Sequence, residues 1–567
     1  MGLGSKKFIR INYSENQIYI QTSINKHVHA CGSVEEIQQN NIMYSNNKIY
    51  QTFLQYLHQV SPEPDPEVSS VVHSPNFNST TYTTILRSNI RNRRFNTAST
   101  PKPTLIITPT KESHVQAAVL CAKNLGIQLL TRSGGHDYNG RSYVSHEKRF
   151  ILLDMFNLHN VSVDIATETA VVQTGAQLGE LYYRIWEKSK VHGFPAGVCP
   201  TVGVGGHVSG GGYGTMIRKY GLSVDHVVDA RIVDANGRVL DRESMGEDLF
   251  WAVRGGGGAS FGVVLSYTVK LVPVPKIHTV FLVSRTIAEN AIDLVYKWQT
   301  AAPTIDRDLF IRVMLMPKVL NNKKTVQASF IAHFLGDSER LLKLMNESFP
   351  ELQVKKEDCL EVNWVESVFF WANLDYKSPA AVLLDRHSDT VNFLIRKSDY
   401  VQTPISRLGW ESIFNKLYEL GKCGFYLNPY GGIMEEIPAD ATPCPHRAGN
   451  LFKIQYSMNW TEDDPELDGK YLNETRVLFE FMTKFVSKNP RGAFLNYRDL
   501  DIGVMVGTGE SGYHSGRVYG EKYFKENFDR LVKVKTAVDP DNFFRTEQSI
   551  PPLPRVKTPE QFLFSRI

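Results

Sequence analysis

Residues 199–214 read Cys-Pro-Thr-Val-Gly-Val-Gly-Gly-His-Val-Ser-Gly-Gly-Gly-Tyr-Gly, and seven of the last twelve of them are glycine. Two more glycine clusters flank this stretch: Arg-Ser-Gly-Gly-His-Asp-Tyr at 132–138 and Arg-Gly-Gly-Gly-Gly at 254–258. Glycine reaches positive φ and lets a ligand approach the main chain closely. Successive backbone N–H groups can also bind phosphate. Isolated glycines usually mark tight turns, but this density predicts loops that hold a phosphate-bearing ligand.

The patterns around these loops predict two kinds of structure. Residues 104–108, 127–131, 151–153 and 170–174 have the apolar character of strands, and residues 112–125 and 177–189 have helical spacing. Strand and helix alternate to about residue 272, which indicates an α/β region. From 277 to 480, alternating strands at 279–283, 309–316 and 325–330 mix with long helices such as 338–348, which indicates α+β. A further helix is expected around residues 523–536.

The composition excludes several classes of protein. The 567 residues carry 63 Lys and Arg against 59 Asp and Glu, and a net charge of +4 is too small to argue for a nucleic-acid partner. No run of 18 apolar residues predicts a membrane span. The six cysteines contain no CxxC pair, and no metal site is predicted. Aromatic residues make up 11%, which suits a protein that binds flat ligands.

One motif suggests a different nucleotide fold. Residues 507–512 match Gly-x-Gly-x-x-Gly after the apolar residues 504–506. We expect no helix behind them, because residues 513–516 interrupt the pattern, so we interpret the match as accidental.

Five segments together carry a specific resemblance: residues 132–136, 199–214, 246–258, 495–501 and 542–552. They resemble the plant berberine bridge enzyme-like flavoproteins of the vanillyl-alcohol-oxidase superfamily, over roughly residues 70–555. The chain is also similar to the cannabinoid synthases and to mulberry-type oxidases and Diels–Alderases. The resemblance implies an α+β, two-domain PCMH-type FAD-binding fold whose substrate domain is an antiparallel sheet covered by helices. It implies a polar N-terminal extension (1–69), an FAD-binding domain (70–275), a substrate-binding domain (276–480) and a C-terminal segment returning to the FAD domain (481–567).

The same resemblance implies FAD attached through two covalent bonds. His136 would bond the flavin 8α-methyl group and Cys199 the flavin C6. An imidazole nitrogen and a thiolate are suitable nucleophiles for an electron-poor ring system. Without their motifs, His136 would be a loop histidine and Cys199 a buried thiol. The full set of expected cofactor-binding residues is Arg132, Ser133, Gly134, Gly135, His136, Tyr138, Cys199, Thr201, Val202, Gly205, Gly206, His207, Gly210, Gly211, Gly212, Tyr213, Val263, Asn496 and Tyr497.

The resemblance also implies a catalytic group. Tyr497 would be the base, with Lys453, Gln455, Tyr213 and Tyr138 around it. Residues two apart on a strand face the same side, so Lys453 and Gln455 on the strand 451–456 can enter one site. A tyrosine is a poor base near pH 7 unless a cation or hydrogen-bond donors stabilise its phenolate. The alternative for Lys453 is a solvated lysine at a sheet edge.

Some residues depart from the family pattern. Gln455 stands where berberine-bridge-forming members carry Glu, and Gln327 stands where cannabinoid synthases carry His, so neither chemistry is implied. Val202 is the oxidase-like choice at the position that tunes oxygen access, so we expect O2 as acceptor and H2O2 as product. Tyr56 replaces a cysteine that most members pair with the counterpart of Cys121. Cys31 is the other candidate partner.

We therefore expect an FAD-dependent oxidase of a plant specialised metabolite or small alcohol. The alternatives are an oxidative cyclase or redox-neutral cycloaddition catalyst acting on prenylated phenolics, a carbohydrate oxidase, and a flavin-storing protein without enzyme activity. The expected partners are O2 and a phenolic, an allylic or benzylic alcohol, or a sugar, bound by a monomer. The resemblance implies the secretory pathway, with residence outside the cell, in the apoplast or in the vacuole, although residues 1–50 contain no readable signal peptide. Sequons stand at Asn12, Asn78, Asn160, Asn346, Asn459 and Asn473.

Overall fold

A computed structural model describes residues 47–59, 68–387 and 392–555. Contacts divide the chain into Met1–Lys48 and Ile49–Ile567, and the fold below is that of the second unit. Most of the expected N-terminal extension lies outside the described residues, as do Cys31 and Asn12. A helix described over residues 47–59 buries Ile49, Phe53 and Leu57, one turn apart, in the core of the first sheet.

The first sheet contains four strands in the order β1-β2-β4-β3. Strands β2 (Leu105–Ile107), β4 (Phe150–Asp154) and β3 (Gln128–Arg132) are parallel, and β1 (Val72–His73) joins antiparallel. Helix α3 (Glu112–Asn124) connects β2 to β3. The parallel strands are almost fully buried, as expected for strands covered on both faces.

The second sheet is antiparallel, in the order β5-β6-β10-β8-β9. Its strands are β5 (Val161–Asp164), β6 (Thr169–Gln173), β8 (Val227–Val233), β9 (Val239–Leu240) and β10 (Val263–Lys270). The expected α/β alternation to residue 272 is therefore correct for the β2–α3–β3 unit and wrong for this sheet, because its strands pair antiparallel although helices separate some of them. The helices between its strands are α4 (Leu178–Lys188), α5 (Val204–Ser209), α6 (Ile217–Tyr220) and α7 (Arg242–Val253).

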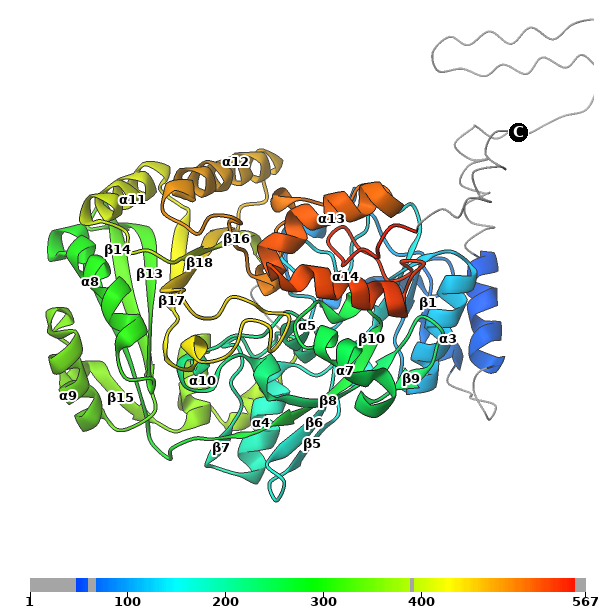
Figure 1. The fold of residues 1–567 in the computed structure, drawn as a ribbon, viewed down its shortest axis with the longest axis horizontal. Helices are drawn as coiled ribbons and strands as arrows, with labels where there is room; N and C mark the ends of the chain where they lie inside the picture. Colours follow the sequence, from blue (N-terminus) through cyan, green and yellow to red (C-terminus); the bar gives the residue numbers. More distant parts are fainter. Residues whose placement is uncertain (1–46, 60–67, 388–391, 556–567) are drawn as a thin grey trace, which may run out of the picture. The chain divides into compact units, whose positions relative to one another are not determined.

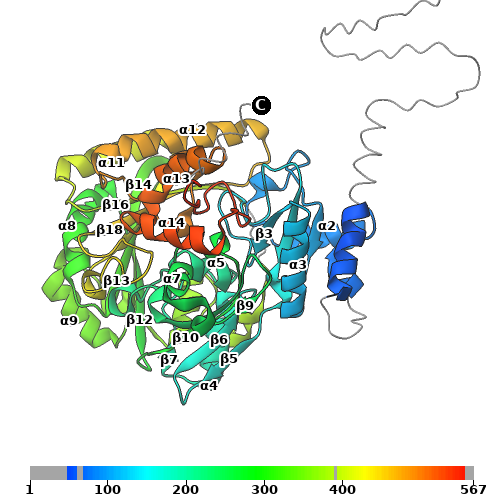
Figure 2. The ribbon, with the colours of Figure 1, turned by 45° about the vertical axis from the view of Figure 1, so that its right-hand side comes forward.

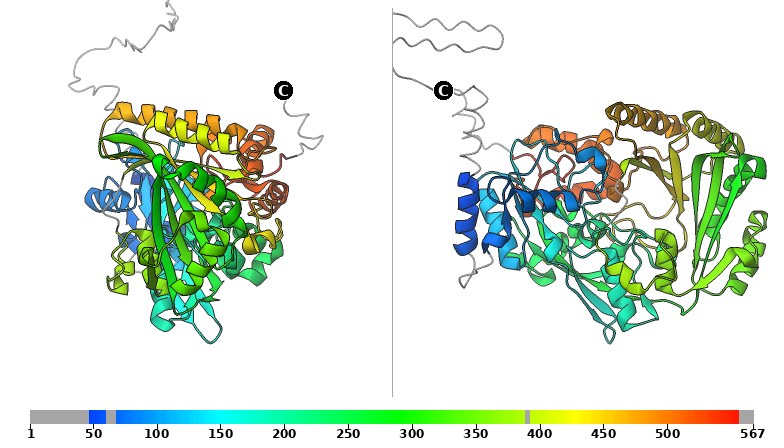
Figure 3. Two further views of the ribbon diagram at one scale, coloured as in Figure 1. Left: turned by 90° about the vertical axis from the view of Figure 1, so that its left-hand side faces the viewer. Right: turned by 180° about the vertical axis from the view of Figure 1, so that it is seen from behind.

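The third sheet is antiparallel, with the order β15-β12-β14-β13-β17-β18-β16. Figures 1 and 3 show helices α8 (Ala291–Thr304), α9 (Ser338–Ser348), α11 (Arg407–Leu420) and α12 (Pro465–Phe481) over its outer face. Side chains of Ile311, Val313 and Leu315 pack into that core. The alternate residues face the other way, toward the first two sheets. The strands are β12 (His278–Thr286), β13 (Leu309–Leu320), β14 (Lys323–Phe334), β15 (Cys359–Val362), β16 (Phe393–Val401), β17 (Gly424–Pro429) and β18 (Phe452–Trp460).

The C-terminal segment contains two helices, α13 (Gly509–Phe524) and α14 (Asn527–Val538), beside α7 (Figure 2). The helix expected around 523–536 is α14, which begins later than expected because the chain turns at Lys525, where φ is +46°. The expectation that no helix follows residue 512 is wrong, because α13 covers this stretch. Glycines in α13 allow close packing: a Cβ on Gly520 would lie 2.1 Å from the Phe528 ring. Residues 503–506 form no strand, so the dinucleotide motif still lacks its required context.

Within the described residues, no helix has both the length and the apolar character needed to cross a membrane.

Candidate active site

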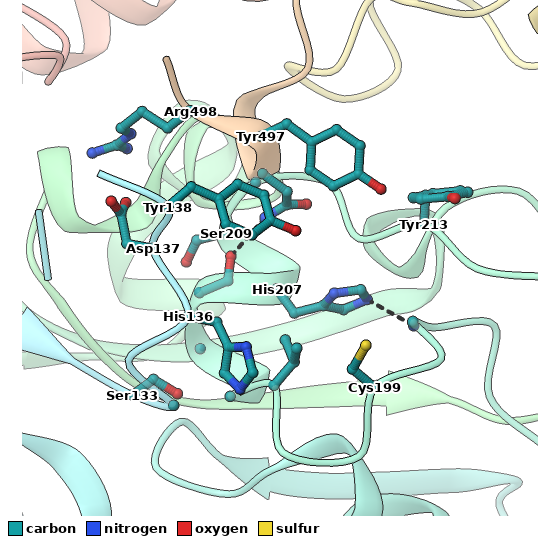
Figure 4. A pocket seen from close by; sticks show the side chains of 18 of the residues that line it. Ser133, His136, Asp137, Tyr138, Cys199, His207, Ser209, Tyr213, Tyr497 and Arg498 are labelled. Carbon is teal, nitrogen blue, oxygen red and sulfur yellow. Dashed lines mark hydrogen bonds between the residues drawn. The ribbon is translucent and has the colours of Figure 1, made fainter. Parts of the chain in front are cut away.

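A cavity of about 990 Å³ lies between the glycine loops and the inner face of the seven-stranded sheet. This is at the upper end of the range of about 300–1,000 Å³ for small-molecule and cofactor sites. Figure 4 shows His136, Tyr138, Cys199, His207, Tyr213 and Tyr497 around it. The structure therefore brings together the loops 133–138 and 197–214, the segment 494–498 and the sheet.

The two glycine loops touch main chain to main chain. A Cβ on Gly134 would lie 2.3 Å from the Gly203 nitrogen, and one on Gly203 would lie 2.2 Å from the Gly134 nitrogen. Any side chain at either position would force the loops apart. Gly206 differs, because a Cβ there would meet no atom within 4 Å although the residue lines the cavity. The missing side chain leaves room for a ligand against the main chain, as the sequence predicted.

His136 and Cys199 both line the cavity. His136 Nε2 lies 3.0 Å from Thr201 Oγ1. Burial, with a smaller contribution from Arg91, lowers the pKa of His136 to about 3, so the imidazole is neutral near pH 7. Cys199 is a free thiol exposed to the cavity. The surrounding protein raises its pKa, and the positive charges of Arg312 and Arg396 act in the opposite direction.

Five of the expected cofactor residues do not line the cavity. Arg132 is fully buried and pairs with Asp154 at 2.6 Å, where it joins two strands. Thr201 contacts His136. Gly211 and Gly212 turn with positive φ behind the cavity wall, and Val263 packs in the core while its neighbour Val264 lines the cavity. The residues that do line it are Ser133, Gly134, Gly135, His136, Tyr138, Cys199, Val202, Gly205, Gly206, His207, Gly210, Tyr213, Asn496 and Tyr497.

Strand pairing aligns the polar residues of the sheet. Asn428 on β17 is opposite Lys453 on β18, and Tyr426 is opposite Gln455. Gln455 Nε2 donates to the Tyr138 hydroxyl at 3.1 Å. Gln455 lines the cavity as expected, and its amide connects the sheet to the loop that carries His136.

Lys453 lies behind the cavity wall. It is fully buried, which excludes the solvated edge lysine. Its Nζ is 3.5 Å from the ring centroids of Tyr213 and Phe494 and 4.6 Å from that of Tyr497, and no described residue accepts a hydrogen bond from it. Burial, aided by the charge of Arg312, lowers the pKa of this ammonium well below its usual value. Lys453 can therefore reach a substrate only through the tyrosines.

Tyr497 lies in an aromatic group at the cavity. Its ring centroid is 5.8 Å from that of Tyr138 and 6.3 Å from that of Tyr213. Burial, followed by the two neighbouring phenols, raises the pKa of Tyr497 well above its usual value, and Arg312 acts against this.

Arg312 is a site residue that the sequence reasoning missed. It lies on β13, donates to the Tyr213 hydroxyl, and donates from Nε to Asn428 Oδ1 at 2.6 Å. The sequence signal that could have identified it is a single charge inside the otherwise apolar strand 309–316. An arginine at such a position needs polar surroundings on the inner face of the sheet. Arg396 on β16 and Tyr426 on β17 also line the cavity and were also missed.

His207 has a supporting position. Its Nε2 lies 3.1 Å from Ser223 Oγ and 3.3 Å from the Gly197 nitrogen, so it holds the loop before Cys199. Burial, and then the charge of Lys453, lowers its pKa to about 3.

Comparison with known proteins agrees with this geometry. The family model described as an FAD binding domain matches residues 103–242, and the one described as berberine and berberine like matches residues 493–551. Berberine bridge enzyme-like 21 of Arabidopsis thaliana is 56% identical over 516 residues, which cover 89% of this chain and 94% of the relative. The chain belongs to the berberine bridge enzyme-like family. Members of this family are FAD-linked oxidoreductases, and this protein is one of them.

Solved structures of relatives share the fold. The structure of BBE-like #28 from Arabidopsis thaliana is 47% identical, with a TM-score of 0.82 over 86% of this chain and 99% of that one. Phl p 4, described as a grass pollen allergen with glucose dehydrogenase activity, is 43% identical, with a TM-score of 0.83 over 89% and 100%. Wild-type Phl p 4.0202 is described as a glucose dehydrogenase, and an isoleucine-to-valine variant as a glucose oxidase.

The cavity fits the FAD of this berberine bridge enzyme-like protein. Main-chain N–H groups of the glycine loops can face a diphosphate, and Gly206 leaves open space beside them. The neutral imidazole of His136 and the thiol of Cys199 line the same cavity.

Cys121 is a buried free thiol in the core that Tyr56 packs against. Asn124, one turn after Cys121 on α3, donates a hydrogen bond to the Tyr56 hydroxyl.

Proposed function

We propose that the protein is an FAD-dependent oxidase that removes hydride from a C–H bond beside a hydroxyl group of a small alcohol, phenolic or sugar. The observation that carries the proposal is the buried Lys453 ammonium against the ring of Tyr497, which faces the cavity. FAD, when bound, supplies a two-electron acceptor for the hydride, and O2 is the final acceptor. The protein must then take the hydroxyl proton.

Tyr497 takes this proton with the help of Lys453. Burial disfavours both a lone ammonium at Lys453 and a lone phenolate at Tyr497, as their opposite pKa shifts indicate. The two titrations are coupled, because each charge stabilises the other. Together the two groups lose one proton more easily than an isolated tyrosine does, and the pair can accept the substrate proton near neutral pH. The hydrogen bond from Gln455 orients Tyr138, whose ring is the neighbour of Tyr497.

Replacing Tyr497 with Phe tests this assignment. We expect the rate of flavin reduction under anaerobic conditions to fall by about 10²–10⁴-fold, the usual contribution of a positioned base. A variant that keeps most of the wild-type rate would remove Tyr497 from this role.

We also propose that His136 and Cys199 hold FAD covalently. Both line the cavity, His136 is neutral, and Thr201 orients its ring. Acid-precipitated wild-type protein should stay yellow, and precipitated His136→Ala/Cys199→Ala double variant should lose its colour. Flavin released from the wild type by acid would contradict the proposal.

O2 as acceptor is supported by Val202, which lines the cavity. The oxidase variant of Phl p 4 also results from a change to valine. The rate of oxygen consumption should therefore match the rate of substrate oxidation, and Val202→Leu should reduce the oxygen rate while a dye still accepts electrons.

A carbohydrate oxidase is the second candidate, favoured by the glucose dehydrogenase activity in the description of Phl p 4. An oxygen-electrode screen of sugars against allylic and benzylic alcohols separates these substrate classes. Substrate loss without oxygen uptake would instead identify redox-neutral cyclisation.

We propose a glycosylated monomer in the secretory pathway. The sequons at Asn160, Asn346, Asn459 and Asn473 are exposed, whereas Asn78 is half-buried and accepts from the Ser74 nitrogen at 2.7 Å. Enzymatic removal of N-glycans from plant-expressed protein should lower its mass, and sedimentation should give the mass of one chain.

A further inference from the structure

Arg312 brings a positive charge to the cavity without a carboxylate partner. Its hydrogen-bond acceptors are the Tyr213 hydroxyl and Asn428 Oδ1, which are both neutral. Nη1 makes no hydrogen bond to a described residue. Because the side chain faces the cavity, that nitrogen is available to a ligand.

Arg396 is a second arginine of the same kind, on the last strand of the sheet. Its Nη1 donates to the carbonyl oxygens of Ile395 and Met458, each at 2.9 Å, and its Nη2 donates to Asn459 Oδ1 at 2.8 Å. These acceptors are also neutral. Arg312 and Arg396 both act on the thiol of Cys199, so the two charges reach the same part of the cavity.

The lining carboxylates do not neutralise these charges. Asp137 Oδ1 accepts from the main-chain nitrogens of Asn139 and Arg141, and Asp375 Oδ1 accepts from the nitrogen of Lys377. No ion pair within the described chain joins either aspartate to Arg312 or Arg396. The sheet side of the cavity therefore has an excess of positive charge.

Neighbouring aromatic rings compensate only part of this charge. The Arg312 Cζ lies 5.0 Å from the Trp371 centroid and 5.8 Å from that of Tyr426, and the Arg396 Cζ lies 5.6 Å from that of Tyr138. Such contacts are weaker than the cost of removing a guanidinium from water. Both arginines also act on the pKa of a tyrosine, Arg312 on that of Tyr497 and Arg396 on that of Tyr138. That role does not use Nη1 of Arg312, which stays available to a ligand.

We propose that the substrate carries a carboxylate, which Arg312 and Arg396 attract into the cavity and hold against the sheet. This inference rests on the proposed oxidase function and specifies its substrate class. Both arginines come from the sheet and act on the thiol of Cys199, so the carboxylate would bind between the sheet and the part of the cavity that Cys199 lines. Charged donors bind carboxylates more strongly than neutral hydroxyl groups.

Matched substrates test the proposal on the FAD-loaded enzyme. Oxygen uptake gives kcat/KM for D-glucuronate against D-glucose and for 4-(hydroxymethyl)benzoate against benzyl alcohol. We expect the carboxylate member of a pair to exceed the neutral one by about tenfold or more, an advantage that falls with added NaCl because salt screens charge. Glucose 6-phosphate forms a third arm, and its preference over glucuronate would overturn the assignment to a carboxylate.

Variants locate the effect. Arg396→Gln should lower the ratio of kcat/KM for the carboxylate substrate to that for the neutral one by about tenfold, mainly by raising KM for the carboxylate. Arg396→Lys should recover part of this ratio. Arg530→Gln is the matched control, because Arg530 is exposed and pairs with Asp248 away from the cavity. An unchanged ratio in Arg396→Gln would overturn the role of Arg396, and equal wild-type rates within each pair would overturn the proposal without any variant.

A binding readout separates this inference from the proposed function. Anaerobic titration of the holoenzyme with sodium benzoate and with benzamide, followed by flavin absorbance, measures anion preference without turnover. Preferential binding of benzoate with no oxidation of any probe would contradict the oxidase and support the anion site. Oxidation of neutral probes with equal binding of both ligands would support the oxidase and contradict the anion site.

Discussion

At the residue scale, the site depends on positive charges without partners of opposite sign, of which Lys453 is fully buried and Arg312 and Arg396 are half-buried. Lys453 rests on three aromatic rings, and Arg312 and Arg396 have only neutral acceptors. Removing a charge from water costs several kcal/mol, and cation–π contacts return about 0.5–2 kcal/mol each. Such groups lower the stability of the chain, and their chemistry at the cavity explains why they are present.

Lys453→Met tests the coupling to Tyr497. Without the ammonium, Tyr497 keeps its raised pKa, so the rise of the flavin-reduction rate with pH should move to more alkaline values. At pH 7 the rate should fall by about 10²–10⁴-fold. The measurement is stopped-flow reduction between pH 6 and 10. Lys470→Met is the control, because Lys470 is an exposed lysine over the single ring of Tyr471. A reduced rate with an unmoved pH profile would assign Lys453 a structural role.

At the scale of elements, the segment that carries Tyr497 is attached to the sheet by a buried ion pair. Lys397 on β16 bonds Asp499 at 2.9 and 3.0 Å and Asp501 at 2.6 Å. Lys397 and Asp499 are almost fully buried. These contacts lie directly after Tyr497 and fix its position against β16 and β18.

Lys397→Met should therefore destabilise the protein strongly. Breaking a buried pair by removing one partner costs about 3–5 kcal/mol, because a charge remains uncompensated. The exposed pair of Arg530 and Asp248 should contribute about 0–1 kcal/mol. Thermal unfolding should thus shift by several degrees in Lys397→Met and little in Arg530→Met. Equal shifts would show that Lys397 does not anchor the segment.

Sequence reasoning identified the site residues on the loops more completely than those on the seven-stranded sheet. The family resemblance placed His136, Cys199 and Gln455 at the cavity, because short local motifs and the spacing along one strand carry it. Arg312 was missed because its neighbours Tyr213 and Asn428 lie 99 and 116 residues away along the chain. Only the strand order β13-β17-β18 brings them together, and no local pattern specifies that order. The helix at 509–524 was missed because its buried glycines resemble a loop in composition.

At the scale of the whole molecule, acid sensitivity follows from buried histidines. Burial lowers the pKa of His207 and His446 to about 3 and that of His278 to about 4, and that of His333 well below its usual value. His333 and His278 lie 2.8 Å apart, ring nitrogen to ring nitrogen, between β14 and β12. Histidines in the unfolded chain have pKa values near 6.5, so they bind protons at pH values where these folded histidines stay neutral.

The sign of the pH effect follows from this difference. Stability rises with pH wherever the unfolded state binds more protons, which here is the window from about pH 3 to 6.5. A pKa difference of one between the folded and the unfolded chain corresponds to about 1.4 kcal/mol, so acidification from pH 6.5 to 4.5 should cost a few kcal/mol per histidine at most. The thermal midpoint should fall steadily over this window, and His446→Gln should make the decline shallower, because a glutamine side chain does not titrate. A midpoint that stays constant between pH 6.5 and 4.5 would mean that the histidines become protonated in the folded protein, which is incompatible with their burial.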